Sequence, residues 1–217
     1  MAPGRLITLE GGEGTGKSTQ ASLLQGALEQ HGIEAVLTRE PGGAELSERI
    51  RAVILDKKPV EPNAEFLLFA AARAEHITAM IKPALERGAW VVCDRYIDST
   101  RVYQGEIEGI RADLVMAIEQ FCVAPWLPDL TIVLDLPTNV STARVSARGA
   151  LSRFDEASAA RHDAIRQAFL KIALREPERC VVVDANAPPD DVGAELLEHV
   201  RARLIKPNSA KRSNVSN

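Results

Sequence analysis

The stretch GGEGTGKS, residues 11–18, decides the fold, because it fits the pattern GxxxxGK(S/T) in the context that this pattern requires. The apolar residues 6–9 before it predict a short buried strand, and residues 18–30 after it carry leucines and alanines on one helical face. Glycine backbone N–H groups and a helix N-terminus then surround a phosphate. Lys17 is expected to reach the β- and γ-phosphates of a nucleoside triphosphate, and the Ser18 hydroxyl to ligate Mg²⁺. The predicted phosphate-binding residues are Gly11, Gly12, Glu13, Gly14, Thr15, Gly16, Lys17, Ser18 and Thr19.

A second Mg²⁺ ligand is expected at the end of a strand. Three apolar runs end in an aspartate, at Asp94, Asp135 and Asp184. Periodicity does not choose among them, because an aspartate after a strand is commonly a turn or cap residue. We favour Asp94, since only this aspartate is followed directly by an arginine, Arg95.

Composition excludes several classes of protein. With 217 residues, 46% of them hydrophobic and 26% charged, the chain is expected to fold as one globular domain. A net charge of -4 argues against a protein that coats a nucleic-acid polymer, so phosphate binding is expected to be local. No apolar run reaches membrane-spanning length and no signal-peptide core follows Met1, so we expect a cytoplasmic protein that binds no membrane. Free thiols are expected at Cys93, Cys122 and Cys180, whose spacing suggests no pairing.

The remaining pattern alternates strands with helices. Further strands are predicted over residues 33–38, 90–93, 130–134 and 180–183. Helices are predicted over residues 46–55, 63–87, 112–122, 138–148, 157–175 and 190–204. This order predicts an α/β fold with a five-stranded parallel sheet flanked by helices, whose ligands bind at the carboxyl ends of the strands. Residues 1–205 are expected to form a single domain, and residues 206–217 a disordered tail.

Three further segments are candidates for ligand contacts. The loop at residues 39–43 presents charges after a strand, although it could equally be a solvated turn. Phe69 and Arg73 share one side of a helix, which is more often core but also suits stacking on a planar base. The polar residues 98–105 could face a ligand. Residues 148–156 hold two arginines around a small flexible centre, and we interpret them as a short lid or an exposed loop.

Taken together, five segments resemble thymidylate kinase of the bacterial type over about residues 5–204. They are LEGGEGTGKST (9–19), TREPGG (38–43), LLFAAAR (67–73), DRYIDSTRVYQG (94–105) and RGALSRFDE (148–156). The resemblance implies a P-loop NTPase fold and, with Mg²⁺, transfer of the γ-phosphoryl group of ATP to dTMP, which gives dTDP and ADP. It also implies a homodimer.

The resemblance further implies roles in the acceptor pocket. Phe69 is expected to stack on thymine, Arg73, Thr100 and Gln104 to address the base edge, and Tyr103 to lie against the deoxyribose. The Glu13 carboxylate is expected to approach the sugar 3′-hydroxyl. The other implied substrate contacts are Arg39, Arg51 and Arg95 around the acceptor phosphate, together with Glu40, Pro41 and Ser99.

One position separates this chain from part of the family. Some members carry an arginine directly after the P-loop acid, where this chain has Gly14. The family variant with this glycine carries basic residues in the lid, so Arg148 and Arg153 become candidates for the missing charge. The implied catalytic residues are Lys17, Arg95, Arg153 and Glu13. His162 stands where many relatives have an aromatic residue, and we interpret it as a packing difference outside the site.

Two other functions share the P-loop. Another P-loop nucleotide or nucleoside kinase would have the same fold with a different acceptor, and a purine preference would favour it. A P-loop ATPase or GTPase switch would hydrolyse its nucleotide slowly without an acceptor and would need neither a base pocket nor a lid. Phe69, Arg73 and Gln104 favour a pyrimidine acceptor over both.

Overall fold

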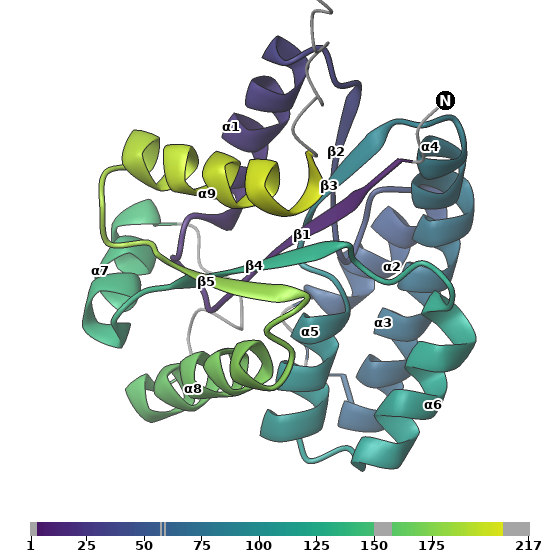
Figure 1. The fold of residues 1–217 in the computed structure, drawn as a ribbon. Coiled ribbons are helices and arrows are strands. Elements are labelled where there is room, and N and C mark those ends of the chain that lie inside the picture. Colours follow the sequence, from purple (N-terminus) through teal and green to yellow (C-terminus); the bar gives the residue numbers. More distant parts are fainter. Residues whose placement is uncertain (1–3, 57, 59, 150–157, 206–217) are drawn as a thin grey trace, which may run out of the picture.

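The fold is taken from a computed structural model, which describes residues 4–56, 58, 60–149 and 158–205 (Figure 1). Its centre is a five-stranded, all-parallel sheet, as predicted, and the structure gives the strand order as β2-β3-β1-β4-β5. The strands are β1 (Leu6–Glu10), β2 (Ala35–Arg39), β3 (Trp90–Asp94), β4 (Leu130–Asp135) and β5 (Cys180–Asp184). Residues 150–156 of the predicted lid, with Arg153, and the tail at 206–217 lie outside the described residues.

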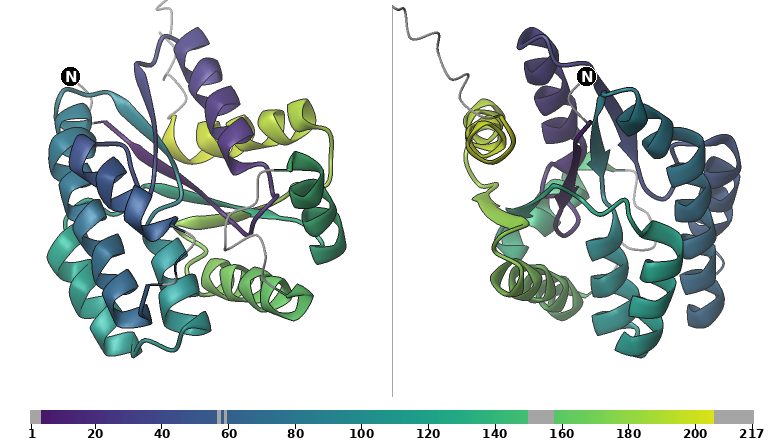
Figure 2. Two further views of the ribbon diagram at one scale, coloured as in Figure 1. Left: turned by 180° about the vertical axis from the view of Figure 1, so that it is seen from behind. Right: turned by 45° about the vertical axis from the view of Figure 1, so that its right-hand side comes forward.

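Helices cover both faces of the sheet. They are α1 (Lys17–Gln30), α2 (Glu45–Ile54), α3 (Pro62–His76), η1 (Ile77–Ile81), α4 (Lys82–Glu86), α5 (Ile97–Thr100), η2 (Arg101–Ile107), α6 (Ala112–Val123), α7 (Thr138–Arg148), α8 (Ala159–Arg175) and α9 (Pro189–Leu204). Helices α1 and α9 lie on one face, whereas α3, α5, α6 and α8 lie on the other (Figures 1 and 2). β1 is buried at every position because both of its faces are covered, which explains its continuous apolar run.

The position of β1 decides where the site forms. β1 lies between β3 and β4, and β2 lies beyond β3, so the loops that follow β1, β2 and β3 meet at one edge of the sheet. These loops carry the phosphate-binding loop, residues 39–43 and Arg95. Strand order therefore brings three segments that are distant in sequence to one edge, as the parallel pattern predicts.

Two helical segments differ from the expectation. The helix predicted over residues 63–87 is divided into α3, η1 and α4, with a π-helical stretch just before Pro83. Proline has no backbone N–H to donate, so a regular α-helical ladder cannot continue through it. None of the helices in the described part of the chain is long and apolar enough to cross a membrane.

Residues 98–105, for which the sequence predicted no helix, lie in α5 and η2. Their polarity has an internal cause. Asp98 is fully buried and accepts hydrogen bonds from Arg179 at 2.7 and 2.9 Å and from Arg101 at 3.2 Å. A buried ion-pair cluster thus gives this helical segment the composition of a loop.

Candidate active site

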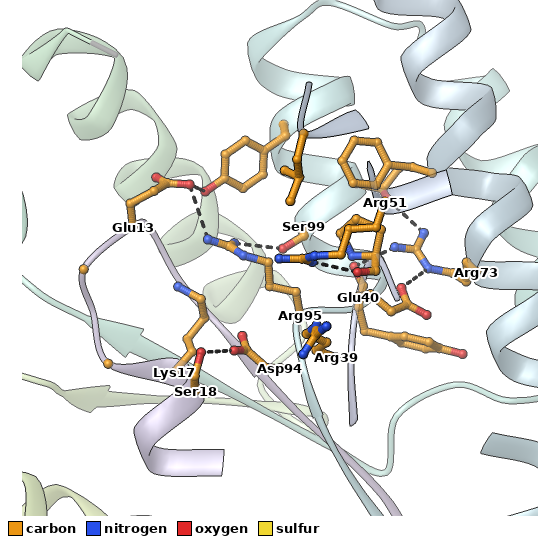
Figure 3. Close-up of a pocket in the computed structure, with 18 of the residues that line it drawn as sticks. Glu13, Lys17, Ser18, Arg39, Glu40, Arg51, Arg73, Asp94, Arg95 and Ser99 are labelled. Carbon is orange, nitrogen blue, oxygen red and sulfur yellow. Dashed lines mark hydrogen bonds and ion pairs between the residues drawn. The ribbon is translucent and has the colours of Figure 1, made fainter. Parts of the chain in front are cut away.

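A cavity of about 850 Å³ opens where the loops after β1, β2 and β3 meet (Figure 3). Six basic side chains and three acidic ones line it, which concentrates positive charge locally in an acidic protein. The predicted residues that line it are Glu13, Gly14, Gly16, Lys17, Ser18, Thr19, Arg39, Glu40, Pro41, Arg51, Phe69, Arg73, Asp94, Arg95, Ser99, Thr100, Tyr103 and Gln104. Gly11, Gly12 and Thr15 lie on the other side of the phosphate-binding loop, where they line a much smaller cavity against α8.

The phosphate-binding loop holds its lysine close to its own backbone. Lys17 begins α1, and its Nζ donates to the Gly12 carbonyl at 2.5 Å and lies 3.2 Å from Thr15 Oγ1. Burial and the positive charge of Arg95 lower the pKa of Lys17 to about 8, although the negative charge of Asp94 raises it. The negative charges of Asp94, Glu13 and Glu10 offset this effect only in part, and an anionic phosphate would add to them.

Gly14 is required by the packing of α7. Its φ is +73°, and a Cβ there would lie 2.5 Å from the Ser141 carbonyl oxygen and 2.9 Å from Val145 Cγ2. The arginine that some thymidylate kinases carry at this position would thus push α7 off the loop and strain the backbone. A glycine is therefore needed at position 14 because α7 packs directly on the phosphate-binding loop.

The three strand-end aspartates have different surroundings. Asp94 accepts a hydrogen bond from Ser18 Oγ, and both side chains line the cavity (Figure 3). Asp135 forms two hydrogen bonds with Arg166 at 2.7 and 2.9 Å, and Asp184 accepts from the backbone of the following turn at 2.9 Å. The two predicted metal ligands, Ser18 and Asp94, are thus side by side.

Arg95 points into the cavity from a left-handed backbone. Its φ is +70°, which is uncommon for a residue with a side chain. The guanidinium donates to the Gly11 carbonyl at 3.0 Å, to Ser99 Oγ at 3.1 Å and to Glu13 Oε1 at 3.3 Å, and it lies 5.2 Å from the centre of the Tyr103 ring. Four neighbours from three segments therefore fix this cation in place.

A buried glutamate supports the loop that carries Arg95. Glu10, the last residue of β1, accepts from the backbone N–H groups of Tyr96 at 2.7 Å and Ser99 at 3.2 Å, and from Ser99 Oγ at 2.7 Å. Burial and the negative charge of Asp98 raise the pKa of Glu10 to about 7, although the hydrogen bond from Ser99 opposes this. The sequence analysis did not select Glu10, which lies between the predicted strand and the phosphate-binding loop, because no local pattern indicates that its carboxylate is buried against residues 96–99.

Glu13 is held by three side chains. Its Oε1 accepts from Tyr103 Oη at 2.5 Å as well as from Arg95, and its Oε2 lies 3.6 Å from His162 Nδ1. Burial raises the pKa of Glu13, but the interactions with His162 and Arg95 outweigh it and bring the pKa down to about 2. The interpretation of His162 as a packing difference outside the site is wrong, because α8 runs behind the phosphate-binding loop and brings this residue to the P-loop acid.

The side of the cavity away from the phosphate-binding loop has a flat aromatic wall and a fixed arginine. Phe69 and Arg73 both face the cavity from α3. Arg73 donates to Glu40 Oε2 at 2.6 Å, to Thr100 Oγ1 at 2.9 Å and to the Tyr96 carbonyl at 3.0 Å. This arrangement suits a planar heterocycle that carries hydrogen-bonding groups on one edge.

Two further arginines lie between these ends. Arg39 donates to both carboxylate oxygens of Glu48 at 3.0 Å, and Arg51 donates to the Pro41 carbonyl at 2.7 Å. Burial, followed by the positive charge of Arg39, lowers the pKa of Arg51. Two neighbouring cations that repel each other are stabilised by a bound anion.

The structure adds one basic residue that the sequence analysis did not select. Arg144 of α7 lines the cavity beside the phosphate-binding loop, and its Nη1 donates to the Ala185 carbonyl at 3.1 Å. Its spacing of four residues from Arg148, on the same helix, could have indicated it. The side chain of Arg148 lies outside the described part of the structure.

Comparison with known proteins gives one consistent result. A family model described as "Thymidylate kinase" matches residues 9–196. A thymidylate kinase of Rhodopseudomonas palustris is 45% identical over 213 residues, which are 95% of this chain and 93% of the relative. A thymidylate kinase of Chromohalobacter salexigens is 45% identical over 94% of this chain and 98% of the relative. The crystal structure of thymidylate kinase from Ehrlichia chaffeensis superimposes with a TM-score of 0.74 at 32% identity and covers 92% of this chain and 99% of that one.

Proposed function

The chain belongs to the thymidylate kinase family and transfers a phosphoryl group from ATP to dTMP, and we propose that the 850 Å³ cavity holds the two nucleotides with their phosphates facing each other. One observation carries this arrangement. The phosphate-binding loop and Arg73 lie at opposite ends of one cavity, with Arg39, Arg51 and Arg95 between them (Figure 3). Neither another P-loop kinase nor a P-loop switch is favoured by the family match.

On the donor side, the phosphate-binding loop holds the ATP phosphates and Lys17 contacts the β- and γ-phosphates. Ser18 and Asp94 would hold Mg²⁺, Asp94 either directly or through a water molecule, because they present adjacent oxygen atoms of the kind that this ion prefers. When bound, Mg²⁺ offsets negative charge on the phosphates during transfer. The chain itself aligns the two phosphates and excludes water, and no strong general base is needed because the acceptor phosphate is already ionised.

On the acceptor side, Phe69 stacks on the thymine ring and Arg73 hydrogen-bonds its edge, with Thr100 and Gln104 beside it. Arg95 then reaches the acceptor phosphate from a fixed position, helped by Arg39 and Arg51. Glu13 accepts from the sugar 3′-hydroxyl, and Tyr103, which donates to Glu13, lies against the deoxyribose. Ser99, Glu40 and Pro41 shape this pocket through their neighbours.

Residues 148–156 act as a lid over the donor phosphates in this proposal. Gly14 leaves the phosphate-binding loop without a cation after Glu13, and α7, which leads into the lid, packs directly on Gly14. Arg148 and Arg153 supply the missing positive charge. Replacing Arg153 should therefore lower turnover more than affinity for ATP, since its contact forms mainly in the transition state.

The proposal is tested by measuring ADP release from ATP and Mg²⁺, first without an acceptor and then with dTMP, dUMP, dCMP, dGMP, AMP or thymidine. Strong dependence on dTMP supports it. Acceptor-independent hydrolysis or preference for a purine monophosphate would contradict the pocket assignment. Replacing Phe69 with alanine should raise KM for dTMP without changing KM for ATP, and an equal rise in both would contradict the stacking role.

We also propose a homodimer that pairs through the face formed by α3 and α6, which lie side by side (Figure 1). Phe121 and Met116 on α6 are 85% and 69% exposed, and Leu67 on α3 is 56% exposed. Sedimentation velocity should give a dimer for the wild type and a monomer for Phe121→Lys. Leu174→Lys is the matched control, since Leu174 is 83% exposed but lies on α8. A monomeric wild type, or dissociation by both variants, would contradict this interface.

Two further parts of the proposal concern the whole chain. Residues 1–205 act as one kinase domain, since a single sheet runs through it. The protein works in the cytoplasm, where ATP and dTMP are available, and its cysteines Cys93, Cys122 and Cys180 are free thiols, which suits a reducing compartment. Fractionation of cells that produce the tagged protein tests the location.

A further inference from the structure

Behind the base pocket, a chain of buried polar side chains leads to Arg73. The Thr38 hydroxyl lies 2.7 Å from His76 Nε2, and His76 Nδ1 lies 3.0 Å from Glu40 Oε1. The other carboxylate oxygen of Glu40, Oε2, accepts from Arg73 Nε at 2.6 Å. The side chains of His76, Glu40 and Arg73 are 0%, 3% and 6% exposed. The contacts therefore form one continuous chain that solvent barely reaches.

The chemistry of these groups gives the contacts with Glu40 a direction. An ionised carboxylate only accepts hydrogen bonds, so His76 Nδ1 is the donor to Glu40. Nδ1–H is thus committed to Glu40, and Nε2 on the other side of the ring faces the Thr38 hydroxyl. Glu40 thus has one oxygen held by His76 and the other by Arg73, and its orientation depends on both partners.

Gly43 packs directly against the contact between Thr38 and His76. Its φ is +82°, and a Cβ there would lie 2.3 Å from His76 Nε2 and 2.4 Å from Thr38 Oγ1. Any side chain at this position would therefore intrude on the contact between Thr38 and His76. The segment TREPGG (38–43) supplies Thr38, Glu40 and Gly43, which all serve the same buried chain.

We propose that His76 is a positioning residue for acceptor recognition: it orients Glu40, which in turn holds the Arg73 guanidinium in the plane that the thymine edge requires. Thr100 and the Tyr96 carbonyl bind the two ends of the same guanidinium, so Glu40 is the contact that sets its Nε side. The inference rests on the proposed role of Arg73 in binding the base. It assigns Glu40 to Arg73 and His76 rather than to the nucleotide.

Two amide substitutions of His76 separate positioning from simple packing. The side-chain nitrogen of asparagine can occupy the place of Nδ1 and donate to Glu40, whereas the longer glutamine reaches the place of Nε2 and keeps only the Thr38 contact. His76→Gln is expected to raise KM for dTMP roughly tenfold or more, the effect of losing a hydrogen bond to a charged group, and His76→Asn to raise it much less. KM for ATP should stay unchanged in both variants. An equal rise in both variants, or a rise in KM for ATP, would overturn the proposal.

A double-mutant cycle with Arg73→Lys distinguishes this inference from the proposed function. If Arg73→Lys alone leaves KM for dTMP unchanged, the role of Arg73 in binding the base is wrong. If Arg73→Lys raises KM and His76→Gln does not, only the role of His76 is overturned. If both raise it, His76 acts through Arg73 only when the double variant is no worse than Arg73→Lys alone, and additive effects would refute the positioning role.

Thr38→Val provides a second measurement that does not depend on how well the His76 variants fold. Valine keeps the shape of threonine but removes the hydroxyl that contacts His76 Nε2. We expect a smaller rise in KM for dTMP than in His76→Gln, with no change in the circular dichroism spectrum. A Thr38→Val enzyme with wild-type KM for dTMP would contradict the inference.

Discussion

Replacing Glu10 with glutamine should change how the stability of the protein depends on pH. Glu10 is fully buried, and its two oxygens serve the backbone N–H groups of Tyr96 and Ser99 and the Ser99 hydroxyl. A glutamine oxygen can still accept both backbone hydrogen bonds, and the amide nitrogen can donate to the hydroxyl. The substitution thus removes the ionisation while it keeps the contacts.

The magnitude follows from the pKa of Glu10, which burial raises from 4.5 to about 7. Below pH 4.5 the carboxyl group is protonated in both the folded and the unfolded state, so its contribution to stability is fully present. As the pH rises through 7, the unfolded state has already ionised and the folded state must follow at a cost, so this contribution is lost. Between pH 5 and pH 8 the wild type should lose roughly 2 to 3 kcal/mol that the Glu10→Gln variant keeps.

Urea unfolding of both proteins at pH 5, 6, 7 and 8 measures this difference. The gap in free energy of unfolding between Glu10→Gln and the wild type should widen in favour of the variant as the pH rises. Glu29→Gln, which removes an exposed carboxylate on α1, is the control and should follow the wild type. A gap that stays constant within about 0.5 kcal/mol across this range would refute the reasoning.

Three further predictions concern charge. Burial lowers the pKa of Lys17 to about 8, and a bound phosphate should raise it again, so the protein should take up protons when ATP binds at pH 8.5. The heat of ATP binding measured by calorimetry should therefore depend on the ionisation enthalpy of the buffer. A heat of binding that does not depend on the buffer would contradict this prediction. Arg179→Met removes the main partner of buried Asp98 and should lower the free energy of unfolding by about 3 kcal/mol. Arg87→Met, which breaks an exposed ion pair, should lower it by less than about 1 kcal/mol. Equal losses for the two variants in thermal denaturation would contradict the argument from burial. Asp94→Asn should shift the Mg²⁺ titration of activity to concentrations roughly tenfold higher or more, and an unchanged titration would remove Asp94 from the metal site.

The sequence predicted the sheet and the edge at which the cavity lies, because both follow from local patterns. The strand before the phosphate-binding loop is a continuous apolar run, and such runs are typical of parallel strands covered on both faces. The favoured Mg²⁺ ligand, Asp94, could be selected because Arg95 follows it. The sequence did not show that Asp135 and Asp184 have different surroundings from Asp94. Arg166, which pairs with Asp135, lies 31 residues further along the chain.

The sequence could not predict contacts that depend on tertiary packing. His162 meets Glu13 only because α8 crosses behind the phosphate-binding loop, and no local pattern records that crossing. Gly14 is constrained by α7, which begins more than a hundred residues later. Glu40 appeared to be one more polar residue near the substrate, whereas its two oxygens bind Arg73 and His76.

Among the residues that the structure describes, those that line the cavity come from three stretches of chain, at residues 13–19, 39–104 and 144–145. Everything on the base side, from Arg39 to Gln104, lies in the middle stretch, whereas the P-loop residues and Arg144 lie outside it. The residues proposed to contact the base are thus encoded in one uninterrupted block of the gene. Recombination between related kinases at two crossover points, one on each side of this block, would exchange the residues on the base side together with Asp94 and Arg95, and would leave the phosphate-binding loop with its original parent.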